Sequence, residues 1–402
     1  MTPVRKWMAA ALGAVALATS PLLQAQQGSS NTLQVGVIGP FSGPSSDFGT
    51  PLLQGIQLAV DEINAVGGYV GRPLTLVIKD DRGDPATGLQ AAQELAAQKV
   101  VATIGFCNTG VAQKSLDVFQ TARIPLIIPC ATGTPLTAQF PAPESYIFRT
   151  SARDSIQAPF VVSDIVKRGW NKVAIFADTT GYGEAGLKDV EAALAARKLK
   201  AVHVTRFPLG VTDQRAELQA ARDAGANVVF SYTVGQENAV IANGRKDLGW
   251  KVPQVGAWPL SFPFFIDGAK DAADGALMAQ TFIAEPSNER RAAFLSAFTR
   301  KHGKRMAVPM AAAQGYDAAY LLTYALFGIR DGKLDGPAVK FALENIRRVY
   351  YGVVATYERP FSLDDKDALT ENMLVMGKVQ GGAVTFAYPE DAKRNLIVQR
   401  KK

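Results

Sequence analysis

Short apolar segments alternate with amphipathic helical segments along this chain, and that alternation is the feature that most constrains its fold. In the first part, four apolar runs have the length and residue types of buried strands: Leu33–Ile38, Leu74–Ile78, Val100–Phe106 and Ile124–Ile128. Between the first two runs, apolar side chains recur at the 3.6-residue helical repeat. After the second run, Asp84–Pro85 supplies an N-cap and a first-turn proline for another helix. Strands that alternate with helices in this rhythm indicate a parallel, doubly wound α/β sheet.

The same rhythm then begins a second time. Four further strands are predicted at Lys172–Ala177, Ala201–Phe207, Val228–Tyr232 and Gln254–Gly256, again with helices between them. Two long helices and a strand-rich tail from Tyr350 follow. A chain of 402 residues exceeds the size at which one hydrophobic core stops growing, so we expect two α/β lobes. No segment rich in Pro, Gly or Ser separates the two sets of strands, which indicates that the lobes exchange strands or share several crossovers.

The N-terminus has the layout of a secretory signal peptide. Arg5 and Lys6 precede an apolar run of Ala, Leu, Val and Gly, and a small residue for cleavage follows at Ala25. The apolar run is shorter than the roughly 20 residues that a membrane-spanning helix needs. We therefore expect residues 1–25 to be a signal peptide, cleaved near Ala25, and the protein to be soluble in the periplasm.

Composition excludes several classes of function. The formal net charge is +7, but Lys and Arg are spread among Asp and Glu, so nucleic acid is not an expected partner. The histidines, His203 and His302, are far apart in the sequence, so the chain does not favour a zinc site or histidine-based catalysis. No G-x-S-x-G nucleophile elbow occurs. We therefore expect no catalytic residue, no metal ligand and no cofactor.

Three loops follow predicted strands at the edge where open α/β sheets bind ligands. They are Gly43–Gly49, Phe106–Gly110 and Pro129–Thr134. Hydroxyl and amide side chains that enter helices, together with free backbone N–H groups, suit a carboxylate or a similar anion. The same residue types are common N-caps, so a single loop is better explained as a helix start. Because two such loops follow neighbouring strands, the sequence supports ligand binding and helix capping equally well.

A series of motifs in order gives the chain a family resemblance. The motifs are Gly39–Pro44, Asp61–Asn64 with Gly67–Gly68, Asp80–Pro85, Pro129–Thr132 and Tyr182–Glu184. Together they resemble the branched-chain amino-acid (leucine/isoleucine/valine) type of periplasmic solute-binding protein, from about residue 33 to 260 and more weakly to about 375.

The resemblance implies a type I periplasmic binding protein fold, with two Rossmann-like lobes of parallel-type sheets joined by three crossovers. Lobe 1 is then expected at residues 31–152 plus 281–356, and lobe 2 at residues 153–280 plus 357–402. The resemblance further implies hinge closure on a small molecule and delivery to an ABC transporter permease, and we expect a monomer.

The resemblance also assigns a binding site residue by residue. Phe48 stands where the family often has an aromatic lid, and Asn108 and Thr132 stand where the ligand carboxylate is held. Cys130 is expected to contribute its backbone, and Asp154 to lie near the ligand's amine side. The expected ligand-binding residues from the second lobe are Tyr182 and Trp258.

Two positions depart from the amino-acid-binding pattern. Where the family has an acid for the ligand's ammonium, the sequence reads Ala257-Trp258-Pro259, and the second-lobe strand that usually presents an aromatic reads Tyr232–Gly235. A buried ammonium needs a charged or fully hydrogen-bonded partner. The loss of that acid favours a flatter, less cationic ligand, such as an aromatic carboxylate.

Other signals compete with this interpretation. Gly181–Gly186 matches the dinucleotide pattern G-x-G-x-x-G, but three residues separate it from the preceding strand and the next strand ends without an acid for a ribose hydroxyl. Asp80 and Asp81 are paired carboxylates in a turn, where Asp commonly bonds the backbone, and we interpret them as structural.

The two cysteines, Cys107 and Cys130, follow neighbouring strands. The family often has a disulfide from the Asp80–Pro85 loop to the position of Cys107, but here that loop carries Gly83. In an oxidising compartment, a Cys107–Cys130 bridge and two free buried thiols are both consistent with the sequence.

The sequence therefore predicts a non-enzymatic receptor that captures a small carboxylate-bearing ligand between two lobes and delivers it to an ABC permease. A sensor that docks to a chemoreceptor or a histidine kinase would use the same closure, so that alternative stays open. A periplasmic enzyme on the same fold is a more remote alternative.

Overall fold

Two separate β-sheets organise the computed structural model, which describes residues 32–303, 306–394 and 401. Among these residues, the first sheet has five parallel strands in the order β2-β1-β3-β4-β5. Their bounds are β1 Leu33–Gly39, β2 Leu74–Asp80, β3 Thr103–Gly105, β4 Leu126–Ile128 and β5 Ile147–Arg149. Because all ladders are parallel, the carboxyl ends of these strands meet at one edge of the sheet.

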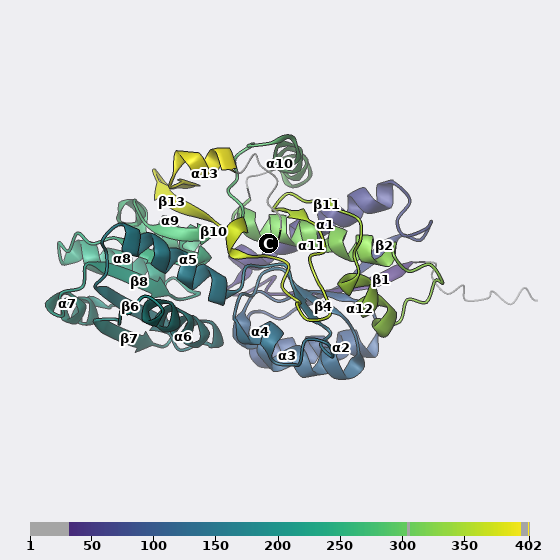
Figure 1. Ribbon diagram of the computed structural model, residues 1–402, viewed down its shortest axis with the longest axis horizontal. Coiled ribbons are helices and arrows are strands. Elements are labelled where there is room, and N and C mark those ends of the chain that lie inside the picture. Colours follow the sequence, from purple (N-terminus) through teal and green to yellow (C-terminus); the bar gives the residue numbers. More distant parts are fainter. Residues whose placement is uncertain (1–31, 304–305, 395–400, 402) are drawn as a thin grey trace, which may run out of the picture. The chain divides into compact units, whose positions relative to one another are not determined.

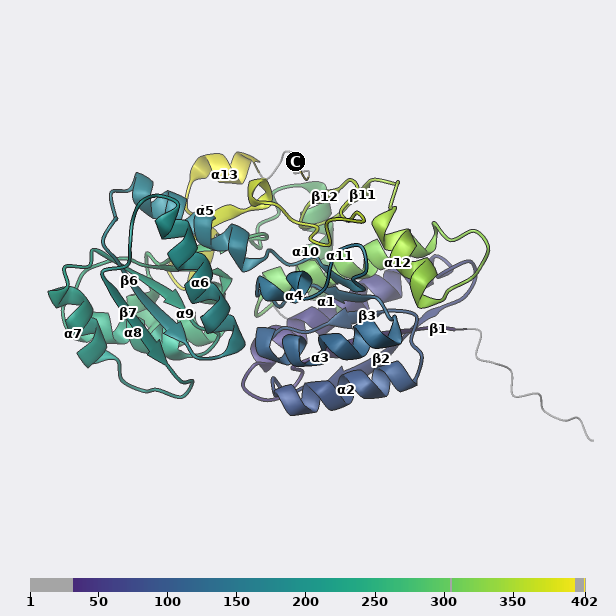
Figure 2. The ribbon, with the colours of Figure 1, turned by 60° about the horizontal axis from the view of Figure 1, so that its bottom comes forward.

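Helices cover the first sheet. They are α1 Ser46–Ala65, α2 Pro85–Ala97, α3 Thr109–Ala122, α4 Pro135–Ala138, α10 Glu289–His302, α11 Pro309–Leu326 and α12 Gly336–Glu344. Helix α1 packs along α11, and α2 packs along α3 (Figures 1 and 2). The predicted start of α2 is confirmed, because the Asp84 side chain accepts a hydrogen bond from Thr87 N at 2.8 Å and Pro85 is the first helical residue. A short ladder, β11 Tyr350–Tyr351 with β12 Thr356–Tyr357, follows α12.

The second sheet is mixed and has the order β14-β13-β10-β9-β8-β6-β7. Its strands are β6 Val173–Asp178, β7 His203–Phe207, β8 Val228–Tyr232, β9 Gln254–Gly256, β10 Leu277–Gln280, β13 Val375–Gln380 and β14 Ala383–Phe386. Strands β6 to β10 are parallel, whereas β13 and β14 join antiparallel. The associated α-helices are α5 Asp154–Lys167, α6 Gly181–Ala195, α7 Arg215–Asp223, α8 Glu237–Asp247, α9 Pro263–Ala269 and α13 Pro389–Arg394. Short 3-10 turns are Trp258–Ser261, Lys270–Ala273 and Glu371–Met373.

Within the residues that the structure describes, the chain passes between the two sheets three times: after β5, after β10, and between β12 and β13. The first and third passages are bonded to each other. Arg149 Nε lies 2.5 Å from Asp367 Oδ1, and both side chains are buried. On the backbone, Arg149 N donates to Lys366 O at 2.8 Å and Ala368 N donates to Arg149 O at 2.9 Å. An ion pair and backbone hydrogen bonds therefore hold these two passages together.

The fold class predicted from the sequence is confirmed, with differences at particular elements. Strands β8 and β9 have the predicted bounds, whereas β3 is shorter than the predicted Val100–Phe106 because the flanking apolar residues are buried outside the ladder. Strand β5 and helix α5 were not predicted. The predicted signal peptide lies outside the described residues.

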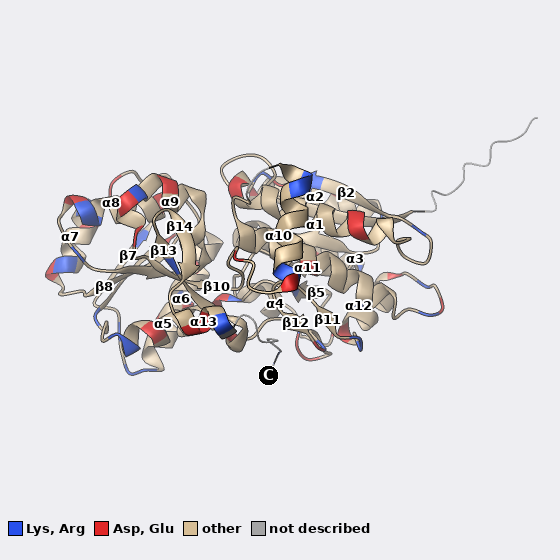
Figure 3. Ribbon diagram, turned by 90° about the horizontal axis from the view of Figure 1, so that it is seen from above, with Lys and Arg blue, Asp and Glu red and all other residues tan. Residues whose placement is uncertain are grey.

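Charged residues are interspersed over the described helices, with Lys and Arg positions beside Asp and Glu positions rather than gathered in one region (Figure 3). In the described part of the chain, no helix is both long and apolar enough to cross a membrane.

Candidate functional site

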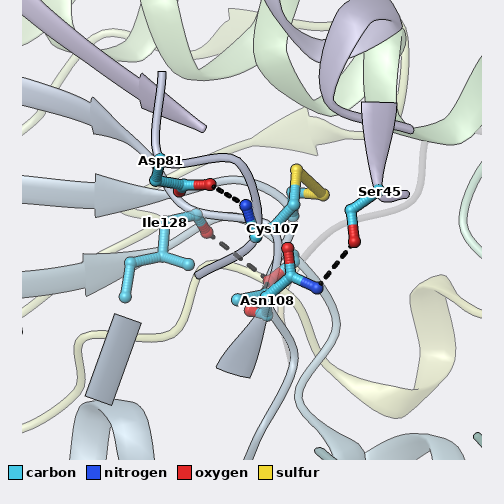
Figure 4. The surroundings of a disulfide bond; sticks show 9 residues. Ser45, Asp81, Cys107, Asn108 and Ile128 are labelled. Atoms are coloured by element: carbon cyan, nitrogen blue, oxygen red, sulfur yellow. Dashed lines mark hydrogen bonds between the residues drawn. A yellow bond between two sulfur atoms is a disulfide. The ribbon is translucent and has the colours of Figure 1, made fainter. Parts of the chain in front are cut away.

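The carboxyl ends of β3 and β4 lead into two loops that are covalently joined. Cys107 and Cys130 form a disulfide with their Cα atoms 4.6 Å apart, so the structure contains the bridge rather than two free thiols (Figure 4). Both cysteines are buried. The predicted contacts Asn108 and Thr132 follow the cysteines by one and two residues, which brings the two predicted anion-binding loops to the same place.

Asn108 occupies the N-cap position of α3, but its side chain does not cap the helix. Its Nδ2 donates instead to Ser45 Oγ, at the N-cap of α1, at 3.1 Å (Figure 4). Its Oδ1 is buried and has no hydrogen-bond partner in the described structure. The first backbone N–H groups of α3 are thus left to other acceptors, as an anion site at a helix start requires.

Four buried polar side chains converge beyond this loop. They are Thr132, after β4; Asp154, the first residue of α5; Tyr182, in the first turn of α6; and Tyr232, the last residue of β8. Asp154 N donates to Thr132 O at 2.9 Å. The rings of Tyr182 and Tyr232 lie 4.9 Å apart between centroids.

Each member of this cluster has an unsatisfied polar atom. Thr132 Oγ1, Asp154 Oδ2, Tyr182 OH and Tyr232 OH are all buried and make no hydrogen bond of ordinary geometry to any described residue. Buried polar groups in folded proteins nearly always have partners. Four buried oxygens in one place without partners of ordinary geometry make this cluster a candidate ligand position.

The Asp154 carboxyl group is electrostatically unusual. Its side chain is 0% exposed, and burial raises its pKa to about 7, while the Tyr232 and Thr132 hydroxyls act in the opposite direction. Farther charges add smaller effects: Asp189 raises this pKa and Arg149 lowers it. Burial, followed by the charge of Asp154, raises the pKa of both tyrosines well above its ordinary value, so both hydroxyls remain hydrogen-bond donors.

Gln157 connects Asp154 to the third part of the predicted site. Its Nε2 donates to Asp154 Oδ1 at 3.3 Å and to Ala152 O at 2.7 Å, and its Oε1 accepts from Trp258 N at 3.4 Å. Gln157 is buried, and sequence reasoning did not single it out. A fixed amide therefore joins the acid to the segment that carries Trp258.

An aromatic chain leads from Trp258 to the first sheet's helices. The Trp258 and Phe262 rings meet edge to face at 4.7 Å, and Phe262 contacts Phe48 of α1 at 5.0 Å. All three side chains are buried. The predicted lid Phe48 thus contacts the predicted Trp258 through Phe262, which was not predicted.

The site loop after β4 is supported from below by Arg149. Its Nη1 donates to Thr132 O at 2.9 Å and to Gly133 O at 2.8 Å, while its Nε pairs with Asp367. The Arg149 guanidinium is thus bonded to backbone carbonyls and to the Asp367 carboxylate. None of the four described residues whose oxygens form the cluster carries a positive charge.

Comparison with known proteins fits this geometry. Residues 32–383 match the family model described as periplasmic binding protein. This chain belongs to that family.

A curated relative of this binding protein is the Leu/Ile/Val-binding protein homolog 3 of Brucella melitensis. It is 32% identical over 231 residues, which is 57% of this chain and 62% of that protein. The alignment thus spans less than two thirds of that relative's own length.

Two solved structures share the fold of this binding protein at 24% identity. LivJ of Streptococcus pneumoniae, in complex with isoleucine, has a TM-score of 0.76 and covers 88% of this chain and 97% of its own. A solute-binding protein of an ABC transporter from R. palustris, in complex with 4-hydroxybenzoate, has a TM-score of 0.76 over 88% and 95%.

In this binding protein, packing explains the glycines of the dinucleotide-like pattern. A Cβ atom on Gly186 would lie 2.0 Å from the ring of Tyr232, and one on Gly183 would lie 2.0 Å from Asp178 O. Gly186 is therefore what allows Tyr232 to lie against α6 with its hydroxyl in the cluster. A tyrosine at the carboxyl end of a buried strand, together with glycines at the start of the helix after the neighbouring strand β6, was the signal that could have identified Tyr232.

The paired carboxylates at the end of β2, Asp80 and Asp81, differ from each other. Asp80 accepts from Phe41 N at 2.9 Å and from Arg82 N at 3.0 Å, a turn role that fits the structural interpretation. Asp81 is buried, accepts from Gly83 N at 2.8 Å and has a pKa that burial raises to about 7. Its Oδ2 has no partner among the described residues. Across the described residues, no group of His, Cys, Asp and Glu could hold a metal ion.

Proposed function

We propose that this chain is a periplasmic solute-binding protein that captures a small carboxylate-bearing molecule and delivers it to an ABC permease. The observation that carries the proposal is the cluster of four unsatisfied buried oxygens on Thr132, Asp154, Tyr182 and Tyr232. A polar ligand would supply the partners that the protein withholds from them.

The carboxylate end of the ligand is proposed to lie between the two loops of the first sheet. The donors for an anion are the Thr132 hydroxyl, the free N–H groups at the start of α3 and the Asn108 Nδ2 hydrogen that is not bonded to Ser45, without a competing ion pair. Cys130 would contribute backbone only, since its sulfur is in the disulfide. Isoleucine and 4-hydroxybenzoate, the ligands of the two similar structures, both carry a carboxylate.

The remainder of the ligand is proposed to meet the aromatic groups from the second sheet. Trp258 and Phe262 offer flat apolar surface, and the Tyr182 and Tyr232 hydroxyls offer donors beside it. Such a slot favours a flat, weakly cationic molecule.

The two lobes are proposed to be residues 31–152 plus 281–356 and residues 153–280 plus 357–402, closing about the three passages between the sheets. The functional event would be this closure, because a permease can recognise the closed form. The protein would act as a monomer in the periplasm after removal of residues 1–25, and it would catalyse no reaction.

A thermal-shift screen of the chain without residues 1–25 tests the proposal. Amino acids, aromatic acids, amides and dicarboxylates would be compared, because a ligand that binds only the native state raises the melting temperature. We expect a rise with at least one carboxylate and none with its amide.

Two variants then place the ligand. Thr132→Ala and Trp258→Ala should weaken binding without unfolding the protein, whereas Thr299→Ala, at an exposed position of α10, should leave affinity unchanged. Unaltered affinity in both site variants would overturn the assignment of the pocket.

A further inference from the structure

The disulfide joins two loops of the proposed site rather than two distant parts of the fold. Cys107 lies two residues beyond the end of β3, and Cys130 lies two residues beyond the end of β4. These strands are already neighbours in the sheet, paired from Thr103 with Leu126. The bond therefore adds little to the topology and acts where the strand ladder has stopped and the proposed ligand contacts begin.

The backbone at this point needs restraint. Phe106, between β3 and Cys107, has φ 68°, a left-handed conformation that is unfavourable for a bulky residue. Two hydrogen bonds hold it: Phe106 N donates to Ile38 O at 2.8 Å, and Ala131 N donates to Phe106 O at 3.0 Å. The second of these bonds comes from the residue after Cys130. The strained turn is therefore held from the partner loop by one hydrogen bond and by the disulfide.

The turn sets where Asn108 points. Past Cys107, the Asn108 side chain is directed to Ser45 at the start of α1, away from the cap position of its own helix (Figure 4). On the other loop, Gly133 N donates to Thr109 Oγ1 at 3.2 Å, a second bond between the loops. Loss of the disulfide would leave two long-range hydrogen bonds to maintain the separation of the Asn108 and Thr132 loops.

We propose that the Cys107–Cys130 disulfide is a positioning element for ligand binding: it fixes the separation of the Asn108 and Thr132 loops before the ligand arrives. Pre-organised groups bind more tightly because less ordering is lost on binding. Ligand affinity then depends on the redox state of this cysteine pair. The inference rests on the proposed function, since it concerns the same carboxylate site.

Hydrogen exchange on the ligand-free protein tests the positioning directly. The variant Cys107→Ala/Cys130→Ala would be compared with Leu343→Ala, a buried α12 position remote from the loops that should lose stability without touching them. We expect the amides of 106–112 and 130–134 to exchange at least about tenfold faster in the cysteine variant only, with β6 and β8 unchanged. Equal acceleration throughout the chain in both variants would show a purely structural bond and overturn the proposal.

Affinity measurements complete the test, with isoleucine and 4-hydroxybenzoate as probes. Under conditions where all proteins are fully folded, a general loss of stability leaves Kd unchanged. We therefore expect Kd to rise about tenfold in the cysteine variant and to stay at the wild-type value in Leu343→Ala. An unchanged Kd in the cysteine variant would contradict the inference. If neither probe binds wild-type protein, a carboxylate found in the thermal-shift screen takes their place; if none of those binds either, the proposed function fails, while the exchange experiment still decides the role of the disulfide.

Discussion

Asp154→Asn separates what this carboxyl group costs the fold from what it contributes to binding. In the folded protein its pKa is raised from 3.8 to about 7, chiefly by burial. A raised acid pKa means that the folded state holds its proton more tightly than the unfolded state. The contribution of Asp154 to the free energy of unfolding is therefore fully present below about pH 4, and it is lost as the pH rises from there to about 7.

The size of the effect follows from the two pKa values. Between pH 5 and pH 8, ionisation of Asp154 should lower the free energy of unfolding of the wild type by roughly 2 to 3 kcal/mol. Asparagine does not titrate. The stability difference between the variant and the wild type should therefore grow by that amount over the same interval. Asp81 and Asp317, whose pKa values burial raises to about 7 and about 6, are present in both proteins and cancel in the difference.

Urea unfolding of both ligand-free proteins at pH 5, 6, 7 and 8 measures this difference. A stability difference that stays constant or shrinks toward pH 8 would refute the argument that Asp154 is buried at an energetic cost. At pH 5 to 6, where Asp154 is mostly protonated and does not repel the ligand, the same variant should bind ligand at least about tenfold more weakly, because an amide replaces a carboxyl group of the cluster. Greater stability with weaker binding is the signature of a functional group kept at the expense of the fold.

The pH dependence of wild-type binding reports the ligand's charge at this position. With a carboxylate ligand that lacks an ammonium, ionised Asp154 repels the ligand, so affinity should fall as the pH rises from 6 to 8. Calorimetric titration across that range measures the trend. Affinity that instead rises with pH would indicate a cationic group on the ligand beside Asp154.

Three further variants test the surrounding structure. Tyr232→Phe should weaken ligand binding about tenfold and change the free energy of unfolding by less than about 1 kcal/mol, since the lost hydroxyl makes no hydrogen bond of ordinary geometry in the described structure; calorimetry and urea unfolding check this. Gly181→Ala places a Cβ atom 3.1 Å from Gly110 Cα, so ligand affinity should fall with little change in melting temperature; equal affinity would show that these helix starts need not approach so closely. Asp367→Asn leaves the buried Arg149 without its anionic partner and should lower the free energy of unfolding by about 3 kcal/mol, with a loss below about 1 kcal/mol in urea counting against a structural ion pair.

The repeating strands and helices could be predicted because their signals are local. Val228–Tyr232 and Gln254–Gly256 are apolar, short and bounded by turn residues, and their predicted bounds match β8 and β9. Asp84–Pro85 is a complete helix start within two residues, and α2 begins there.

Elements that depend on distant partners could not be found in this way. Strand β5 has three residues and ends at Arg149, whose burial depends on Asp367, which is 218 positions away. Helix α5 begins after Arg153, which provides no side-chain cap, and it contains Pro159. Strand β5 is too short to show a period, and helix α5 lacks a capping residue at its start.

The residues of the candidate site also fall into those that local signals identify and those that depend on distant contacts. Asn108 and Thr132 lie beyond strand ends, which sequence reasoning can identify as ligand positions. Gln157 and Tyr232 belong to the site because of contacts made across the fold, to Trp258 N and to the face of α6 opened by Gly186. The disulfide is a similar case, since the sequence left bridged and free cysteines equally open.

A crystal structure of the protein with the ligand found by thermal shift tests the central claim most directly. We expect a single small molecule whose carboxylate accepts hydrogen bonds from the Thr132 hydroxyl and the start of α3, with the Tyr182 or Tyr232 hydroxyl bonded to the ligand as well. A ligand bound elsewhere, or bound here with all three hydroxyls still unsatisfied, would contradict it.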